Sequence, residues 1–320
     1  MNKKSVITVN RKTILELDHP LLIHETFFSG QTFRWETIGN TPYSYVSIIQ
    51  NMPLVIRQTG TQKIEAFTNH ENQSEKTGNF CLKSYLTLDI DNRTLFDERF
   101  RNRYPEIMGL LEDFEGLKLL RQDPFETALT FMCAQGIGMP LIRRQIALLC
   151  ERFGKPVTLA FEGMQYPLFC FPDPERLASS PAGELRLCTN NNCSRAMNIR
   201  KMAEAVASGT LDFAKLASSG LPLGELRQEL CRFDGIGPKI ADCIALFGLG
   251  RHDAFPVDTH VRRYLFEWFG IQRAGMSLTQ RNYLLLQEEV ASLLGTELAG
   301  YAGHLLFHCW RRKVRKLHSA

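Results

Sequence analysis

The sequence lacks the features that mark membrane, secreted and metal-binding proteins. No apolar run reaches the roughly 20 residues that a membrane-spanning helix needs. The first ten residues carry two lysines but no apolar stretch of signal-peptide length, so we expect an intracellular protein. The nine cysteines are scattered without paired C-x-x-C sets, so we expect reduced thiols and neither zinc nor an iron–sulfur cluster. We therefore predict a protein with no membrane association, no metal and no cofactor.

A strong excess of one charge sign is also absent. Lys and Arg number 38 against 34 Asp and Glu, a formal net charge of +4 that does not identify a partner by itself. The one dense basic cluster is residues 311–316, and both phosphate contact and a solvated tail remain open for it. With 320 residues and 44% apolar composition, the chain can bury one large core or two or three smaller ones.

The pattern of the chain changes from strand to helix near residue 82. Short β-rich runs at 26–28, 32–35, 43–49 and 54–57 are separated by Gly, Pro and Asn, which is typical of antiparallel hairpins. Residues 69–79 are polar and predict a loop. Helical periodicity then predicts helices at 93–104, 107–114, 124–133, 141–153, 195–208, 223–232, 238–249, 261–269, 278–294 and 299–314.

Strands followed by helices predict an α+β protein, with a small antiparallel sheet domain in front of a mostly helical body. We place the β-rich domain at 1–118 and the helical region at 119–320. The segment 156–181 carries five prolines, and we predict an irregular excursion between helices there.

A helix, a tight hairpin and a second helix are predicted at 223–249. Leucines at 223, 226 and 230 have helical spacing, Gly235-Ile236-Gly237 interrupts it, and apolar residues at 240, 244 and 247 resume it. Glycines let the backbone turn sharply, and the start of the second helix presents N–H groups and a positive dipole end to an anion. A DNA phosphate fits such a site.

Lys239 stands one or two residues into that second helix. The positive end of the helix dipole disfavours an ammonium group, which favours a neutral amine that can attack a sugar aldehyde carbon and form a Schiff base. A solvent-facing lysine that contacts phosphate is the alternative.

Asp258 follows Pro256-Val257 and precedes the apolar period of the next predicted helix. A carboxylate there suits a helix cap. A carboxylate facing a pocket also stabilises the positive charge that develops on a sugar ring when a glycosidic bond breaks. The two roles are compatible.

Cys243 lies four residues after Lys239, so both side chains project from one face of the predicted helix. Cys243 either lines a pocket beside the lysine or packs in the core.

These motifs resemble the helix-hairpin-helix (HhH-GPD) DNA glycosylase superfamily, and more closely its 8-oxoguanine DNA glycosylase/AP lyase branch. The resemblance covers most of the chain. It rests on FSGQTFRW at 28–35, LLRQDP at 119–124, the hairpin with residues 239–243, PVDTH at 256–260 and a final helix through 302–307.

The resemblance implies an enzyme that extrudes a damaged nucleotide from double-stranded DNA and removes its base. By this resemblance Lys239 attacks the deoxyribose C1′, the resulting imine undergoes β-elimination, and Asp258 stabilises the developing charge. The other implied roles are a backbone carbonyl of Gly30 that accepts from N7–H of 8-oxoguanine, a purine sandwich of Cys243 and Phe307, a pocket wall at Pro256, a phosphate contact at His260, and an opposite-base contact at Arg195. For Phe307, the residues alone predict only a core position in the last helix.

The resemblance further implies a monomer. We expect that it needs no cofactor and acts in the cytoplasm or nucleoid of a prokaryote or in the nucleus of a eukaryote. The hairpin glycines Gly235 and Gly237 grip the DNA backbone in this family.

The chain departs from the branch at several positions. Residues 135–141 (QGIGMPL) replace an asparagine run and an arginine that reads the opposite cytosine, Ser194 replaces an aromatic wedge, and Gly303 replaces a glutamine. These changes predict a relaxed preference for the opposite base. The asparagines at 190–192 either supply a polar wedge or form a turn.

Two other functions stay open. One is a glycosylase of the same fold for an alkylated base, since the loop at 135–137 resembles that branch, although Lys239 favours the lyase. The other is a non-catalytic DNA-binding module in which the hairpin only grips phosphate.

Overall fold

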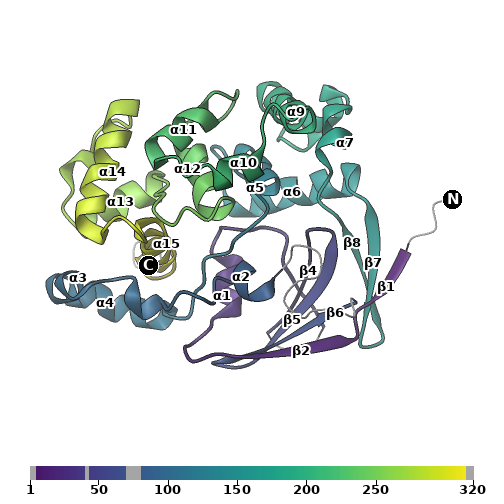
Figure 1. Ribbon diagram of the computed structural model, residues 1–320, viewed down its shortest axis with the longest axis horizontal. Helices are drawn as coiled ribbons and strands as arrows, with labels where there is room; N and C mark the ends of the chain where they lie inside the picture. The colour runs from purple at the N-terminus through teal and green to yellow at the C-terminus, as the bar shows by residue number, and fades with distance from the viewer. Residues whose placement is uncertain (1–4, 40–42, 70–80, 315–320) are drawn as a thin grey trace. The chain divides into compact units, whose positions relative to one another are not determined.

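The fold is α+β, as predicted, although one pair of strands lies inside the region predicted to be helical (Figure 1). The computed structural model describes residues 5–39, 43–69 and 81–314. The loop predicted at 69–79 therefore lies almost wholly outside the described residues, as does the end of the basic cluster at 315–316. None of the described helices has the length and apolarity that a bilayer crossing requires.

The strands form two sheets. They are β1 (Ser5–Thr8), β2 (Arg11–Glu16), β3 (Glu36–Thr37), β4 (Ser44–Ile49), β5 (Met52–Gly60), β6 (Lys63–Thr68), β7 (Pro156–Phe161) and β8 (Met164–Phe169). The larger sheet is antiparallel in the order β2-β6-β5-β4-β3, and the smaller has the order β1-β7-β8, with β1 parallel to β7.

The helices are short before residue 124 and longer after it. They are α1 (Ile23–Phe28), α2 (Leu82–Tyr85), η1 (Asn92–Thr94), α3 (Glu98–Arg103), α4 (Pro105–Leu111), η2 (Glu112–Phe114), α5 (Pro124–Cys133), α6 (Met139–Phe153), α7 (Pro174–Ala178), α8 (Ala182–Leu187), α9 (Cys193–Ala207), α10 (Phe213–Ser218), α11 (Leu223–Cys231), α12 (Pro238–Phe247), α13 (Thr259–Glu267), η3 (Gln272–Gly275), α14 (Gln280–Leu294), α15 (Ala299–Cys309) and η4 (Trp310–Val314).

The chain forms two compact units, each built from two separate segments. Met1–Tyr85 and Leu129–Asp212 form the first, and Leu86–Ala128 and Phe213–Ala320 form the second. This grouping differs from the division predicted at 118/119, because β1 pairs with β7 about 150 residues later and so joins the two segments of the first unit. As a boundary along the sequence, 118/119 stays a prediction.

Both sheets contribute to one apolar cluster in the first unit. Its members come from β4, β5 and β6 of the larger sheet and from β7 and β8 of the smaller one; they include Val46, Val55, Phe67, Leu159 and Leu168. Arg57 spans the sheets, with its guanidinium over the rings of Phe67 and Phe161 and an ion pair to Glu162 at 2.8 Å.

Three local predictions in the first unit were wrong. The proline-rich segment predicted as irregular contains the β7–β8 hairpin, which turns through Glu162 and Gly163, both at positive φ. Its prolines are tolerated because Pro156 begins β7 and Pro167 lies on the edge strand β8. The run at 26–28, predicted as β-rich, belongs to α1, and the run at 32–35 is irregular chain before β3. Phe27 stacks on Trp35 at 3.9 Å between ring centroids, so tertiary packing and not strand pairing buries these aromatics.

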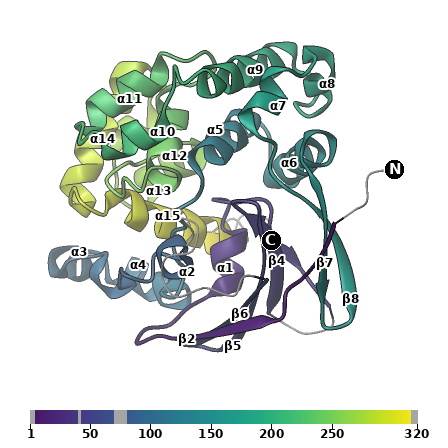
Figure 2. The ribbon, with the colours of Figure 1, turned by 45° about the vertical axis from the view of Figure 1, so that its right-hand side comes forward.

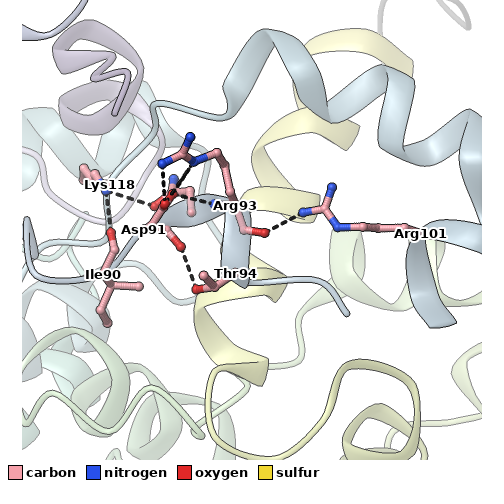
Figure 3. A network of polar contacts seen from close by, with 7 residues as sticks. Ile90, Asp91, Arg93, Thr94, Arg101 and Lys118 are labelled. Atoms are coloured by element: carbon pink, nitrogen blue, oxygen red, sulfur yellow. Dashed lines mark hydrogen bonds and ion pairs between the residues drawn. The ribbon is translucent and has the colours of Figure 1, made fainter. Parts of the chain in front are cut away.

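In the second unit, α11 packs with α12, α15 packs with α13, α14 and α4, and α3 packs with α4 (Figure 2). A buried lysine in the segment 86–128 belongs to a polar network in this unit. Lys118 is fully buried, and its Nζ donates to the carbonyl of Ile90 at 2.6 Å and to Oδ1 of Asn92 at 3.2 Å (Figure 3). The hydroxyl of Tyr301 on α15 donates to the same Asn92 Oδ1 at 2.8 Å. The network therefore links η1 to α15.

The stability contributed by Lys118 should increase with pH. Burial lowers the pKa of Lys118 to about 8 from its ordinary value of 10.5. Between these values the unfolded chain binds more protons than the folded one, so the contribution of Lys118 to the free energy of unfolding rises as pH rises from about 8 to about 10.5. Lys118→Met, which also leaves the Ile90 carbonyl without this donor, should cost about 1–3 kcal/mol at neutral pH.

Urea unfolding of both proteins across that pH window measures the difference in stability, and the titrations of other groups cancel in it. The difference between wild type and Lys118→Met should widen toward high pH. A constant difference would contradict the prediction.

Candidate active site

The predicted helix-hairpin-helix is confirmed as α11 and α12 (Figure 1). Leu226 and Leu230 of α11 and Ile240 and Ile244 of α12 are buried, so the two periodic apolar stripes face the core. Gly235 has φ of +87°, a conformation that residues with a Cβ rarely adopt. The hairpin therefore requires glycine at this position.

Helix α12 begins without a side-chain cap. Its first residues follow Gly237, which has an extended backbone and whose missing Cβ would meet nothing within 4 Å. No neighbour within the chain therefore excludes a side chain at Gly237. What glycine provides is an open approach to the backbone N–H groups at the positive end of the helix dipole.

Lys239 and Cys243 lie on one face of α12, as their spacing predicted. Their side chains share a hydrogen bond, and the thiol is buried. Burial raises the pKa of Cys243 to about 12, and Lys239 opposes this increase. Cys243 is thus a neutral thiol that contacts the lysine.

Asp258 is the N-cap of α13, which confirms the predicted cap. Its Oδ1 accepts hydrogen bonds from the backbone N–H groups of His260 and Val261, both at 2.8 Å. Among the residues that the structure describes, Oδ2 accepts no hydrogen bond. The carboxylate also acts electrostatically on Cys243, whose pKa it raises. One oxygen of Asp258 therefore caps α13, and the negative charge of the carboxylate acts on Cys243, the hydrogen-bond partner of Lys239.

Phe307 is the exception on an otherwise buried helix. Every other residue of α15 is buried, whereas Phe307 is partly exposed. The ring of His260 meets it edge-on with 6.0 Å between centroids, and the guanidinium of Arg311 lies 5.3 Å from its centroid. Phe307 is therefore not the plain core residue that its periodicity predicts, and His260 and Phe307 come together from α13 and α15.

Pro256 is partly exposed between two buried neighbours, Phe255 and Val257.

The ring of Phe255 explains the glycine at 303, where a glutamine was expected. A Cβ at Gly303 would lie 2.1 Å from Phe255 Cε2, so no side chain fits there unless this ring moves. The absence of the glutamine expected at 303 thus has a steric cause.

Arg311 contacts Phe307 but was not singled out from the sequence. The sequence places it in the basic cluster, and the useful signal was its position one helical turn after Phe307. Asp242 was also missed; the signal there is an acidic residue inside the apolar run of α12, all of which is buried from Ile240 to Phe247.

Gly30 and Arg195 belong to the first unit. Gly30 has φ of +98° just after α1. The backbone around it is held in place, since Ser29 Oγ and Gln31 Nε2 both donate to the carbonyl of Thr26, at 3.2 and 2.9 Å. The Ser-Gly-Gln element is therefore a fixed turn that only glycine adopts readily.

Arg195 lies in the first turn of α9, which Asn192 caps by accepting from the Arg195 N–H at 2.9 Å. Its guanidinium donates to the carbonyl of Gln135 at 2.6 Å, so Arg195 contacts the loop at 135–138 that departs from the family. Asn190 and Asn191 have positive φ, which supports the turn interpretation of the asparagine run.

Three features together define a class of DNA-repair proteins: the HhH hairpin, a lysine at the start of its second helix and a carboxylate at the start of the next helix. Residues 14–128 match the family "8-oxoguanine DNA glycosylase, N-terminal domain", and residues 130–286 match "HhH-GPD superfamily base excision DNA repair protein". The chain belongs to the HhH-GPD superfamily, in its 8-oxoguanine DNA glycosylase branch.

Individual relatives agree. The chain is 29% identical to the N-glycosylase/DNA lyase OGG1 of Arabidopsis thaliana, over 92% of this chain and 78% of the relative. It resembles the apo form of the Clostridium acetobutylicum 8-oxoguanine glycosylase/lyase with a TM-score of 0.77 and 25% identity, over 95% and 99% of the two chains. The complex of that enzyme with double-stranded DNA containing cytosine opposite 8-oxoguanine gives a TM-score of 0.75, 25% identity and coverage of 94% and 98%.

Proposed function

We propose that the chain is a bifunctional DNA glycosylase and AP lyase that excises 8-oxoguanine, or a related oxidised purine, from double-stranded DNA. The observation that carries this proposal is the hydrogen bond between Lys239, at the start of α12, and Cys243, one turn later, together with the electrostatic effect of the Asp258 carboxylate on Cys243. A module that only binds DNA phosphate does not need a lysine, a thiol and a carboxylate in one place.

The chemistry follows from these residues. The amine nitrogen of Lys239 attacks C1′ of the extruded nucleotide, the N-glycosidic bond breaks, and the base leaves with its bonding electrons and takes up a proton. The carboxylate of Asp258 stabilises the positive charge that develops on the sugar. The lysine nitrogen then loses a proton, and cleavage of the C1′–O4′ bond opens the sugar ring and gives a protonated imine at C1′. This imine acidifies the hydrogen at C2′, and β-elimination removes that proton and breaks the bond from C3′ to its oxygen, so that the phosphate leaves with the bonding electrons.

Recognition is assigned to the remaining site residues. Gly30 offers its carbonyl to N7–H of the lesion, Cys243 and Phe307 enclose the flipped purine, and Pro256 forms a pocket wall. Gly235, Gly237 and His260 bind the DNA backbone, and Arg195 contacts the strand opposite the lesion. We propose that the enzyme works as a monomer, in the nucleoid or the nucleus.

Single-turnover incubation with an end-labelled 8-oxoguanine:cytosine duplex tests the proposal directly. Sodium borohydride should trap a covalent adduct on this duplex and none on the undamaged duplex. If the adduct forms only on a duplex with an alkylated base, the substrate assignment is wrong; if no lesion gives an adduct, the lyase assignment is wrong.

Gly30→Ala should reduce discrimination more than DNA binding. The alanine Cβ strains a backbone at φ of +98° and costs about 1–2 kcal/mol, which shifts the carbonyl that reads the lesion. The ratio of excision rates for lesions with and without N7–H should fall, while Kd for the duplex changes little.

Gly209→Ala is the matched control for Gly30→Ala. Gly209 has φ of +74° in the same unit, and its added Cβ would meet nothing within 4 Å, so its substitution carries similar strain away from the proposed site. An equal loss of discrimination in both variants would refute the role of Gly30.

A further inference from the structure

A buried carboxylate lies on the helix of Lys239 and outside the proposed chemistry. Asp242 is fully buried on α12, between Lys239 and Cys243 in sequence. Nε of Arg227 on α11 donates to its Oδ1 at 2.8 Å, and the hydroxyl of Tyr283 on α14 donates to its Oδ2 at 2.5 Å. Burial raises the pKa of Asp242 to about 6, and both partners oppose that increase. Both carboxylate oxygens are thus engaged, each by a different helix.

The Tyr283 hydroxyl makes a second contact. It accepts a hydrogen bond from the backbone N–H of Val257 at 3.3 Å, and Val257 directly precedes Asp258. Because the hydroxyl proton is directed to Asp242, the oxygen lone pair remains available for this N–H. One hydroxyl therefore joins the helix of Lys239 to the residue next to the capping carboxylate.

Helix α14 makes a second contact with the segment 255–258. Gln287, one turn after Tyr283, donates from Nε2 to the carbonyl of Phe255 at 2.9 Å. Tyr283 and Gln287 together fix the backbone on the N-terminal side of Asp258, while the cap bonds to His260 and Val261 fix it on the other side.

We propose that Tyr283, oriented by Asp242, is a positioning residue that, together with Gln287, sets the place of the Asp258 carboxylate relative to Lys239. The proposal rests on the proposed glycosylase chemistry. Tyr283 touches no reacting atom, and its effect passes through Val257 to Asp258. Loosening this contact displaces the carboxylate from the developing charge, and a displacement of about 1 Å can cost about 100-fold in rate.

The test is Tyr283→Phe, which keeps the ring and removes the hydroxyl. With one of two contacts from α14 lost, base release from the lesion duplex under single-turnover conditions should slow about tenfold. Borohydride trapping on DNA with a preformed abasic site should stay within about twofold, since imine formation on a ready aldehyde depends on Lys239 and not on the developing charge at the sugar. Kd for the lesion duplex should also be unchanged.

Tyr301→Phe is the matched control. It removes a buried tyrosine hydroxyl of the same unit, which donates to Asn92 far along the chain from the 255–258 segment. It should leave base release at the wild-type rate. The positioning role is refuted if Tyr301→Phe slows base release as much as Tyr283→Phe does. It is also refuted if Tyr283→Phe reduces base release and trapping to the same extent.

Gln287→Met provides a second route if Tyr283→Phe does not fold. Gln287 is only partly buried, and the variant loses the contact with Phe255 without exposing a core position. It should show the same selective slowing of base release, and a wild-type rate refutes the proposal. A wild-type protein that releases no base from any lesion would instead overturn the proposed function, so the two failures are distinguishable.

Discussion

Lys239→Gln protein should form no covalent adduct with lesion DNA under borohydride and should not nick the strand. Glutamine has similar length and fits the same helix position, but its amide is not a nucleophile and cannot form an imine. Helix α12 carries an apolar buried face that does not depend on Lys239, so fold and much of the DNA affinity should remain. Gel analysis of trapping and nicking, with melting temperature and Kd measured in parallel, checks the expectation.

Lys63→Gln is the control for loss of one positive charge. Lys63 lies on β6 and pairs with Glu16 at 2.6 Å, and its substitution should leave trapping intact. Trapping that persists in Lys239→Gln would mean that another amine is the nucleophile. It would remove the central residue of the proposed mechanism.

Asp258→Asn should slow base release by at least about 100-fold, the effect typical of losing one preorganised electrostatic group. Asparagine is also a favoured N-cap, and its Oδ1 can still accept from the N–H groups of His260 and Val261. The free energy of unfolding should therefore fall by less than about 1 kcal/mol. Single-turnover base release and urea unfolding separate the two effects.

Asp97→Asn tests the cap alone. Asp97 caps α3 by accepting from the Phe100 N–H at 2.7 Å, so the same substitution changes a cap in the same unit without touching the site. Its base release should be normal. A near-normal rate in Asp258→Asn would reduce Asp258 to a helix cap.

The parts of the site that could be predicted from sequence are those set by local spacing. The glycines at 235 and 237 predict the hairpin, the interval of four residues predicts the shared face of Lys239 and Cys243, and an aspartate before an apolar period predicts the cap at 258. Each depends on backbone geometry over fewer than about ten residues, which periodicity reports well.

Features that depend on tertiary contacts could not be predicted in this way. The partial exposure of Phe307 depends on what covers the rest of α15, and the steric need for glycine at 303 depends on the ring of Phe255, about 50 residues earlier. The β7–β8 hairpin was missed because its prolines lie at a strand start and on an edge strand, and only the pairing reveals those positions.

The interleaving of the two units has a consequence for biosynthesis. Strand β1 is made first, yet its partner β7 begins at Pro156, and the first unit ends at Asp212. The ribosome thus releases residues 86–128 of the second unit before the first unit can close, and that segment waits for Phe213 and beyond. The first unit can close once Asp212 has been released, whereas the second unit also needs the residues from Phe213 onward. A fragment that stops at 118 would lack β7 and β8 and would expose the cluster around Val46 and Phe67 to aggregation.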